Sequence, residues 1–204
     1  MIPRRIWEVI ALKEVLLIDC CIRRESSRTR RLAQAFVNAL DPARFHVTVL
    51  DPEAEGLRPL TGVFFQAREE LLARGELDHP RFRYARQLAQ ADLVVFAAPF
   101  WDLSFPAILK IYIENVCVEG ITFACDEEGL HGSCKASRMV FLTTRGAVYG
   151  GSPLEQGSRY LEAMARFFGI PAYSCIAADG MDLGDPASPL AGACEQAEAL
   201  ARSL

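Results

Sequence analysis

The chain lacks both a long apolar run and an excess of positive charge. Its longest unbroken apolar run, from Leu93 to Trp101, covers nine residues, whereas a membrane-spanning helix needs about 20. The formal net charge is −4, which argues against a general nucleic-acid binder. We therefore expect neither a membrane protein nor a partner of DNA or RNA.

The cysteines lack the spacing of a metal site or a disulfide framework. There are seven, scattered along the chain, with no C-x-x-C pair and with Cys20 and Cys21 adjacent. The N-terminal apolar residues are interrupted by charges and show no small-residue cleavage site, so they make a poor signal peptide. Reduced thiols and a cytoplasmic location are the expectation.

The chain does have enough apolar residues for a large core, since 51% of its 204 residues are hydrophobic. Five apolar segments read as strands, at 15–19, 45–50, 93–98, 138–143 and 173–178. Helical patterns are expected at 28–40, 62–74, 80–91, from Ser104 onward, at 154–168 and at 188–202. This alternation predicts an α/β, doubly wound parallel sheet of five strands in the order 2-1-3-4-5. We expect residues 1–14 to form an N-terminal extension and 15–204 a single domain.

Residues 91–123 form the central segment of the predicted fold, and the other elements are placed relative to it. The strand at 93–98 is apolar on both faces, as a central parallel strand requires, and stops at Pro99. A short loop of Phe100, Trp101, Asp102 and Leu103 follows, and then a helix with Ser104 as its predicted N-cap and Pro106 in its first turn. Residues 118–123 read as extended and 126–137 as a hairpin-like excursion. Because ligands sit at the carboxyl ends of central strands, the two aromatic residues suit a planar ligand.

Two further loops should reach the same edge. Residues 20–29 carry three hydroxyls and several arginines at the start of a helix but no glycine, so they form neither a Walker loop nor a dinucleotide fingerprint. They suit either a phosphate or a capped, solvated basic helix. Residues 143–151 are rich in glycine and hydroxyls and suit either a ligand or an ordinary strand-to-helix turn. The aromatic loop is open to two interpretations as well, because Trp101 could simply cover the sheet edge.

Together these motifs resemble the FMN-dependent NAD(P)H azoreductase and quinone reductase family, which has a flavodoxin-like fold. The similarity is carried by three motifs, at residues 27–29, at 98–103 together with 109–110, and at 144–147. Residues 120–123 and 168–170 also match that family's pattern. The resemblance implies FMN-phosphate contacts at Cys21, Ser27, Arg28 and Thr29. It implies isoalloxazine contacts at Phe100, Trp101, Asp102, Leu103, Thr144, Arg145, Gly146 and Ala147. Three positions depart from the family pattern, with Cys21 in place of Ser, Asp102 in place of Asn and Ala147 in place of a second Gly.

The same resemblance implies that NADH or NADPH reduces FMN and that a quinone, an azo compound or a similar flat acceptor is reduced in turn. Trp101 and Tyr149 are the candidate substrate contacts. No catalytic triad is visible, because the three histidines lie away from these motifs. A homodimer is implied, and the broad apolar surface of the helix at 108–116 also favours it. Two alternatives stay open: a flavodoxin-type electron carrier with a protein redox partner, and a flavin-free scaffold of the same fold.

Overall fold

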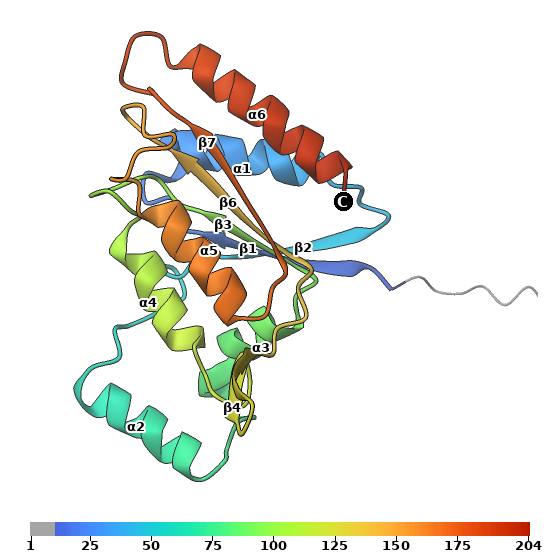
Figure 1. Cartoon of the computed structure of the whole chain (residues 1–204), viewed down its shortest axis with the longest axis vertical. Coiled ribbons are helices and arrows are strands. Elements are labelled where there is room, and N and C mark those ends of the chain that lie inside the picture. Colours follow the sequence, from blue (N-terminus) through green and yellow to red (C-terminus); the bar gives the residue numbers. More distant parts are fainter. Residues whose placement is uncertain (1–10) are drawn as a thin grey trace, which may run out of the picture.

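Five parallel strands form the centre of the protein (Figure 1). The computed structural model describes residues 11–204, so most of the predicted N-terminal extension lies outside the described residues. The strands are β1 (Lys13–Asp19), β2 (Phe45–Leu50), β3 (Leu93–Ala97), β6 (Arg138–Thr144) and β7 (Ala172–Ala178). They pair in the order β2-β1-β3-β6-β7. This is the predicted 2-1-3-4-5 order, which is confirmed, although β1 begins two residues earlier than expected.

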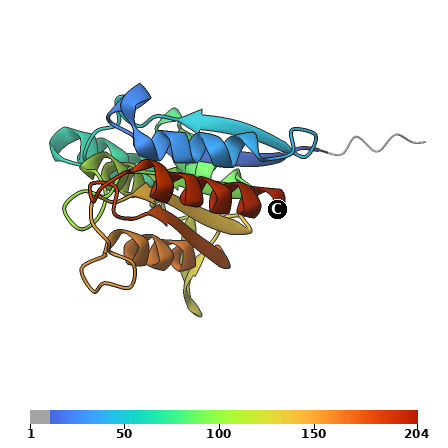
Figure 2. The ribbon, with the colours of Figure 1, turned by 90° about the horizontal axis from the view of Figure 1, so that it is seen from above.

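Helices cover both faces of the sheet (Figures 1 and 2). On one face lie α1 (Arg28–Asn38) and α6 (Ala187–Arg202), and on the other lie α3 (Arg83–Gln90), α4 (Ala107–Val116) and α5 (Gly157–Phe167). Helix α2 (Gly62–Ala73) lies apart from the sheet, and two short 3-10 segments occur at Arg24–Ser26 and Pro80–Phe82. No helix among residues 11–204 has the length and apolar character needed to cross a membrane.

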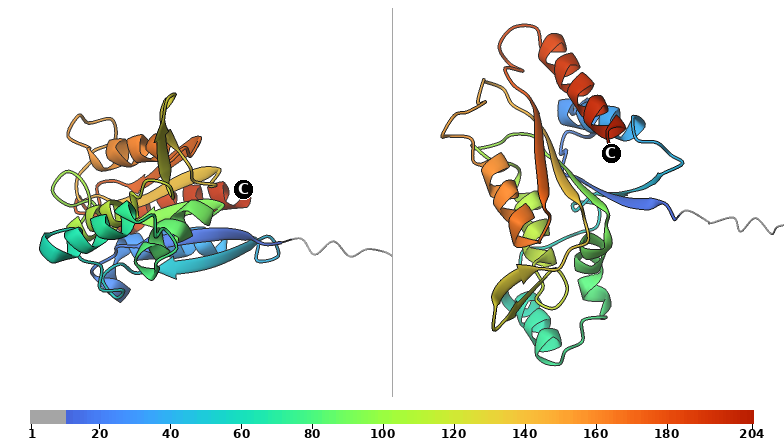
Figure 3. Two further views of the ribbon diagram at one scale, coloured as in Figure 1. Left: turned by 90° about the horizontal axis from the view of Figure 1, so that it is seen from below. Right: turned by 45° about the vertical axis from the view of Figure 1, so that its right-hand side comes forward.

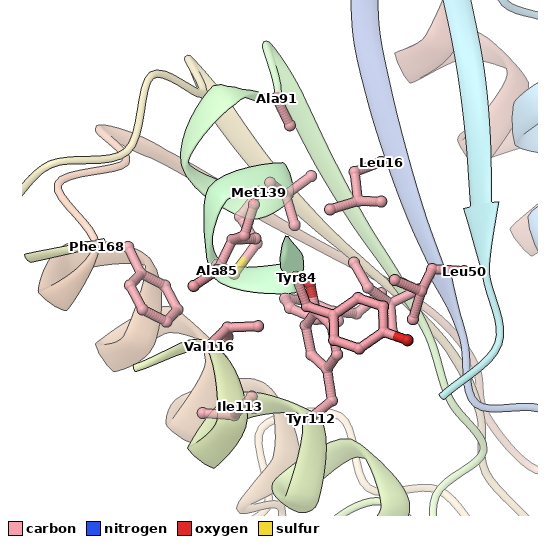
Figure 4. Close-up of a cluster of buried hydrophobic side chains, with 14 of the residues drawn as sticks. Leu16, Leu50, Tyr84, Ala85, Ala91, Tyr112, Ile113, Val116, Met139 and Phe168 are labelled. Carbon is pink, nitrogen blue, oxygen red and sulfur yellow. The ribbon is translucent and has the colours of Figure 1, made fainter. Parts of the chain in front are cut away.

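The strands contribute to two separate apolar cores because successive side chains point to opposite faces. In β1, Leu16 and Ile18 pack on the α3–α4–α5 side, whereas Val15 and Leu17 pack on the α1–α6 side. Figure 4 shows the first of these cores, in which the ring of Tyr112 is fully buried. The alternating burial explains why the central strands are apolar on both faces.

A two-stranded hairpin, β4 (Phe123–Asp126) and β5 (Gly129–Gly132), lies towards the same end of the molecule as α2 (Figure 3). The predicted excursion is therefore a true hairpin that begins three residues earlier than expected. The prediction of an extended segment at 118–123 was wrong in its middle, because residues 120–122 form a turn. The Thr122 hydroxyl accepts from Val118 N at 3.1 Å and donates to Val116 O at 2.8 Å, and this local pairing closes the turn.

The start of α4 also differs from the prediction. Ser104 is not its N-cap, because the helix begins at Ala107 with Pro106 in the N-cap position. A residue that precedes proline avoids helical backbone angles, so Phe105 cannot continue a helix into Pro106. Ser104 instead exchanges two backbone hydrogen bonds with Trp101, at 3.1 and 2.8 Å. The aromatic loop is thereby closed into a tight turn before the helix starts.

Candidate functional site

An open cavity of about 220 Å³ lies at the carboxyl edge of the sheet, beyond the ends of the central strands. Its lining comes from four loops: Arg23, Ser26, Ser27, Arg28 and Thr29; Pro99, Phe100 and Trp101; Thr144, Arg145 and Gly146; Met181 and Asp182. The three loops predicted to meet do meet here. Of the predicted site residues, Cys21, Asp102, Leu103, Ala147 and Tyr149 do not line the cavity.

One end of the cavity is suited to an anion. Ser27 caps α1, since its hydroxyl oxygen accepts from Arg30 N at 3.2 Å. The buried Thr29 hydroxyl lies 2.7 Å from that of Thr144, which ties the helix start to the end of β6. Arg23 and Arg28 add positive charge to the free N–H groups of the helix N-terminus. Hydroxyls, guanidinium groups and a helix N-terminus together form a set of donors typical of phosphate sites.

Cys21 packs against the end of the sheet. Its thiol is buried and donates a weak hydrogen bond to Ala97 O at 3.6 Å. Burial, and then the neighbouring Asp19 carboxylate, raise the pKa of the Cys21 thiol well above its ordinary value. The side chain therefore stays neutral and packs in the α1–α6 core.

The other end of the cavity is aromatic. The turn closed by Trp101 and Ser104 places Asp102 and Leu103 at φ angles of 49° and 67°. Such angles cost a non-glycine residue about 1–2 kcal/mol each, and strain of this kind concentrates at functional sites. The turn leaves Trp101 40% exposed at the cavity wall. The result is a flat apolar surface available to a ligand.

Arg145 is a buried cation beside the aromatic end of the cavity. Its side chain is only 5% exposed and forms ion pairs with Asp179, at 3.2 Å, and with Glu155, at 3.4 Å. Its guanidinium carbon lies 5.6 Å from the centre of the Phe100 ring, which in turn packs at 4.6 Å on Tyr149. A buried cation needs such partners, because removing its charge from water is costly. Within the described part of the chain, Arg145 Nε has no hydrogen-bond partner.

The loop after β7 is a fourth wall that the sequence analysis did not include. Arg28 Nη1 donates to Met181 O at 3.0 Å and to the Asp182 carboxylate at 2.8 Å. A Cβ atom on Gly146 would come within 2.5 Å of an Asp182 carboxylate oxygen, so a larger residue there would displace the Asp182 side chain. The sequence does contain a signal for this wall. Asp179-Gly180 follows a predicted strand, and the loops at the carboxyl edge of a parallel sheet converge.

Metal-ligating residues do not cluster in the part of the chain that the structure describes. No group of three or more His, Cys, Asp or Glu side chains there could hold a metal ion. His131 lies on the hairpin, 3.7 Å from Asp126, and is exposed. It is thus placed outside the cavity.

The strand order and the loops at the carboxyl edge define a flavodoxin-like α/β protein, and the family described as "Flavodoxin-like fold" matches residues 13–201. The FMN-dependent NADH:quinone oxidoreductase 2 of Clostridium acetobutylicum is 37% identical over 178 residues, covering 84% of this chain and 88% of that protein. The FMN-dependent NADH:quinone oxidoreductase of Coprothermobacter proteolyticus is 33% identical over 191 residues, covering 88% and 93%. The chain belongs to the flavodoxin-like family that includes the FMN-dependent NADH:quinone oxidoreductases, so the predicted resemblance is confirmed.

Solved structures agree on the fold. An azoreductase from Bacillus anthracis superposes with a TM-score of 0.82 at 24% identity, covering 95% of this chain and all of that one. An FMN-dependent NADH-azoreductase from the same organism, solved in complex with FMN, also gives a TM-score of 0.82, at 20% identity, covering 94% and 99%. At these identities the likeness establishes the architecture alone.

Proposed function

We propose that the protein is an FMN-dependent NAD(P)H oxidoreductase that transfers two electrons to quinones, azo compounds or similar flat acceptors. The observation that carries the proposal is one cavity with a phosphate-type donor set at one end and an aromatic wall at the other. The relatives named as FMN-dependent NADH:quinone oxidoreductases support the same reaction. Either NADH or NADPH is the electron donor.

The residues of the cavity fit FMN. Ser27, Arg28 and Thr29 would hold the phosphate, because they combine a helix N-terminus, hydroxyls and a guanidinium group. Phe100, Trp101 and the Thr144–Gly146 segment would hold the isoalloxazine. The buried Nε of Arg145, which has no partner among the described residues, offers a further donor to a bound group. Among the departures from the family pattern, Cys21 would contribute least, because its thiol is engaged with Ala97.

The flavin, when bound, supplies the two-electron chemistry, and the protein positions the reactants. Trp101, 40% exposed beside the cavity, would stack on a flat acceptor or on the nicotinamide. Tyr149 packs on Phe100 and would act by holding that ring in place, in addition to its predicted contact with substrate. Asp102, Leu103 and Ala147 lie outside the cavity lining and would act by shaping the turns that carry the lining residues Trp101 and Gly146.

We also propose a homodimer and a cytoplasmic location. Helix α4 buries Leu109, Tyr112, Ile113 and Val116 within the monomer, so its apolar surface is largely used there. The support for a dimer comes from a groove lined by Phe105 and Tyr160 and from the neighbouring Leu154, which is 54% exposed. Light scattering should give a mass near twice 22.6 kDa, and Leu154→Glu should lower it. Seven cysteines without a disulfide support a reducing compartment.

Chromatography of the supernatant of the denatured protein tests the cofactor. We expect FMN to be the flavin released into the supernatant. Release of FAD, or the absence of any flavin even after reconstitution, would refute the assignment. An anaerobic titration with NADH and NADPH, followed by a panel of quinones and azo dyes, tests the reaction. Turnover of a quinone by the purified protein, with no second protein added, distinguishes an enzyme from an electron carrier that requires a protein partner.

A further inference from the structure

An ion pair between Arg28 and Asp182 spans two walls of the cavity. Arg28 belongs to the first turn of α1, and Asp182 lies 154 positions later, in the loop between β7 and α6. The Arg28 Nη1 atom is 2.8 Å from the Asp182 carboxylate, and both side chains line the cavity. A cationic residue of the candidate phosphate site is therefore already bound to an anion of the protein itself.

This pair is exchangeable. The Arg28 side chain is 40% exposed and that of Asp182 is 70% exposed, so water screens their attraction and the pair contributes little to stability. The loop does not depend on the pair for its position, because Asp182 N donates to Gly146 O at 2.9 Å and Met181 N donates to Arg145 O at 2.9 Å. Arg28 can thus change partners while the backbone of the loop stays in place.

We propose that Asp182 is a specificity-determining residue whose carboxylate competes with the ligand's phosphate for Arg28. This inference rests on the proposed function, in which the cavity binds FMN. A phosphate must displace Asp182 from Arg28 or share the guanidinium with it, and the two anions repel each other. Asp182 accordingly weakens the binding of a flavin that carries a phosphate and leaves a flavin without one unaffected. The carboxylate therefore reduces the preference of the site for FMN over riboflavin.

The experiment measures the Kd of FMN and of riboflavin by flavin fluorescence, for the full-length wild type and for Asp182→Asn. Asp185→Asn is the matched control: it removes one charge from the same loop, and among residues 11–204 the Asp185 carboxylate accepts only from Ala187 N, at 2.9 Å. Asp182→Asn should bind FMN roughly two- to fivefold more tightly, the range expected for one exposed ion pair. Its affinity for riboflavin, and the affinity of the Asp185→Asn control for both flavins, should stay unchanged.

Salt and a double variant sharpen the test. The gain for FMN should shrink at high ionic strength, because exposed charges are screened. In an Arg28→Met background, Asp182→Asn should give no gain in FMN affinity, since the cation for which the two anions compete is then missing. Asp182→Ser serves as a second variant if Asp182→Asn folds poorly.

Two outcomes would overturn the inference while leaving the proposed function intact. One is unchanged or weaker FMN binding by both Asp182 variants, and the other is an equal gain for FMN and riboflavin. A wild-type protein that binds neither flavin would instead refute the proposed function and the inference with it.

Discussion

Replacing Arg145 by methionine tests whether the buried ion pairs position the candidate site. The variant removes the cation that faces Glu155 and Asp179, whose side chains are 9% and 23% exposed. Methionine retains much of the apolar volume, so the main change is the loss of charge. Two carboxylates would then remain close together without the guanidinium between them.

The expected loss of unfolding free energy is large. Breaking a buried ion pair by removing one partner typically costs 3–5 kcal/mol. Both carboxylates retain a backbone donor, Ser158 N for Glu155 and Gly150 N for Asp179, each at 2.9 Å. We therefore expect a loss near the lower limit, about 3 kcal/mol, or roughly 6–12 °C in Tm for a chain of this size. Adding Glu155→Gln to Arg145→Met should recover about 1 kcal/mol, since a buried uncompensated charge is removed.

Urea unfolding of flavin-free protein, followed by circular dichroism, measures these changes without the contribution of ligand binding. Arg166→Met is the matched control, because Arg166 is 77% exposed and pairs with Glu162 one helical turn away. That substitution should cost less than about 0.5 kcal/mol. Equal losses for Arg145→Met and Arg166→Met would refute the reasoning, and so would a double variant less stable than Arg145→Met alone.

Four other substitutions have clear expected outcomes. Gly132→Ala should destabilise the protein by about 3 kcal/mol in urea unfolding, because its Cβ would lie 1.9 Å from backbone atoms of residues 168 and 169. Gly192→Ala in α6, where a Cβ would have no atom within 4 Å, should instead stabilise the protein by about 0.5–1 kcal/mol. A Gly132→Ala variant more stable than Gly192→Ala would contradict the packing. The native protein should show one fast-reacting thiol in a spectrophotometric titration, since Cys125 alone of the seven cysteines is exposed. Cys125→Ser should abolish this fast reaction. A fast phase that persists in the variant would be inconsistent with the burial of the other six thiols. Hydrogen bonds from Tyr84, at 2.5 Å, and from a neighbouring arginine lower the pKa of Glu55 below its ordinary 4.5. The ionised Glu55 carboxylate therefore stabilises the folded state above pH 4.5, and this stabilisation is lost as the pH falls through the folded-state pKa. Unfolding free energy should therefore fall more steeply below pH 4.5 in the wild type than in Glu55→Gln, and parallel pH profiles would exclude the linkage.

The strand order followed from the sequence because buried parallel strands and amphipathic helices have distinct apolar periods. The start of α4 could not be predicted with the same rules, since Ser104 is a favourable N-cap while Pro106 keeps Phe105 out of a helix. The second preference is steric and prevails. The turn at 120–122 was missed because the Thr122 side chain competes with an extended backbone, and nothing in its apolar pattern reveals this.

The candidate site was predictable where it consists of residues directly following a strand. Ser27, Phe100 and Thr144 come together because parallel strands end at one edge. The partners of Arg145 and Arg28 were not predictable, since an ion pair between residues far apart in sequence leaves no local pattern. Side-chain direction was also hidden: Cys21 occupies a motif position, yet its thiol points to the Ala97 carbonyl.

The two apolar cores on opposite faces of the sheet have a consequence for amide hydrogen exchange. Strands β1, β3 and β6 each pair on both edges and are covered on both faces, so their amides become accessible to solvent only when both cores open together. The β4–β5 hairpin forms a separate two-stranded sheet and should exchange through local fraying. Three of the four cavity loops follow these slowest-exchanging strands. A ligand can therefore enter and leave through motions of the loops while β1, β3 and β6 remain closed for the lifetime of the folded state.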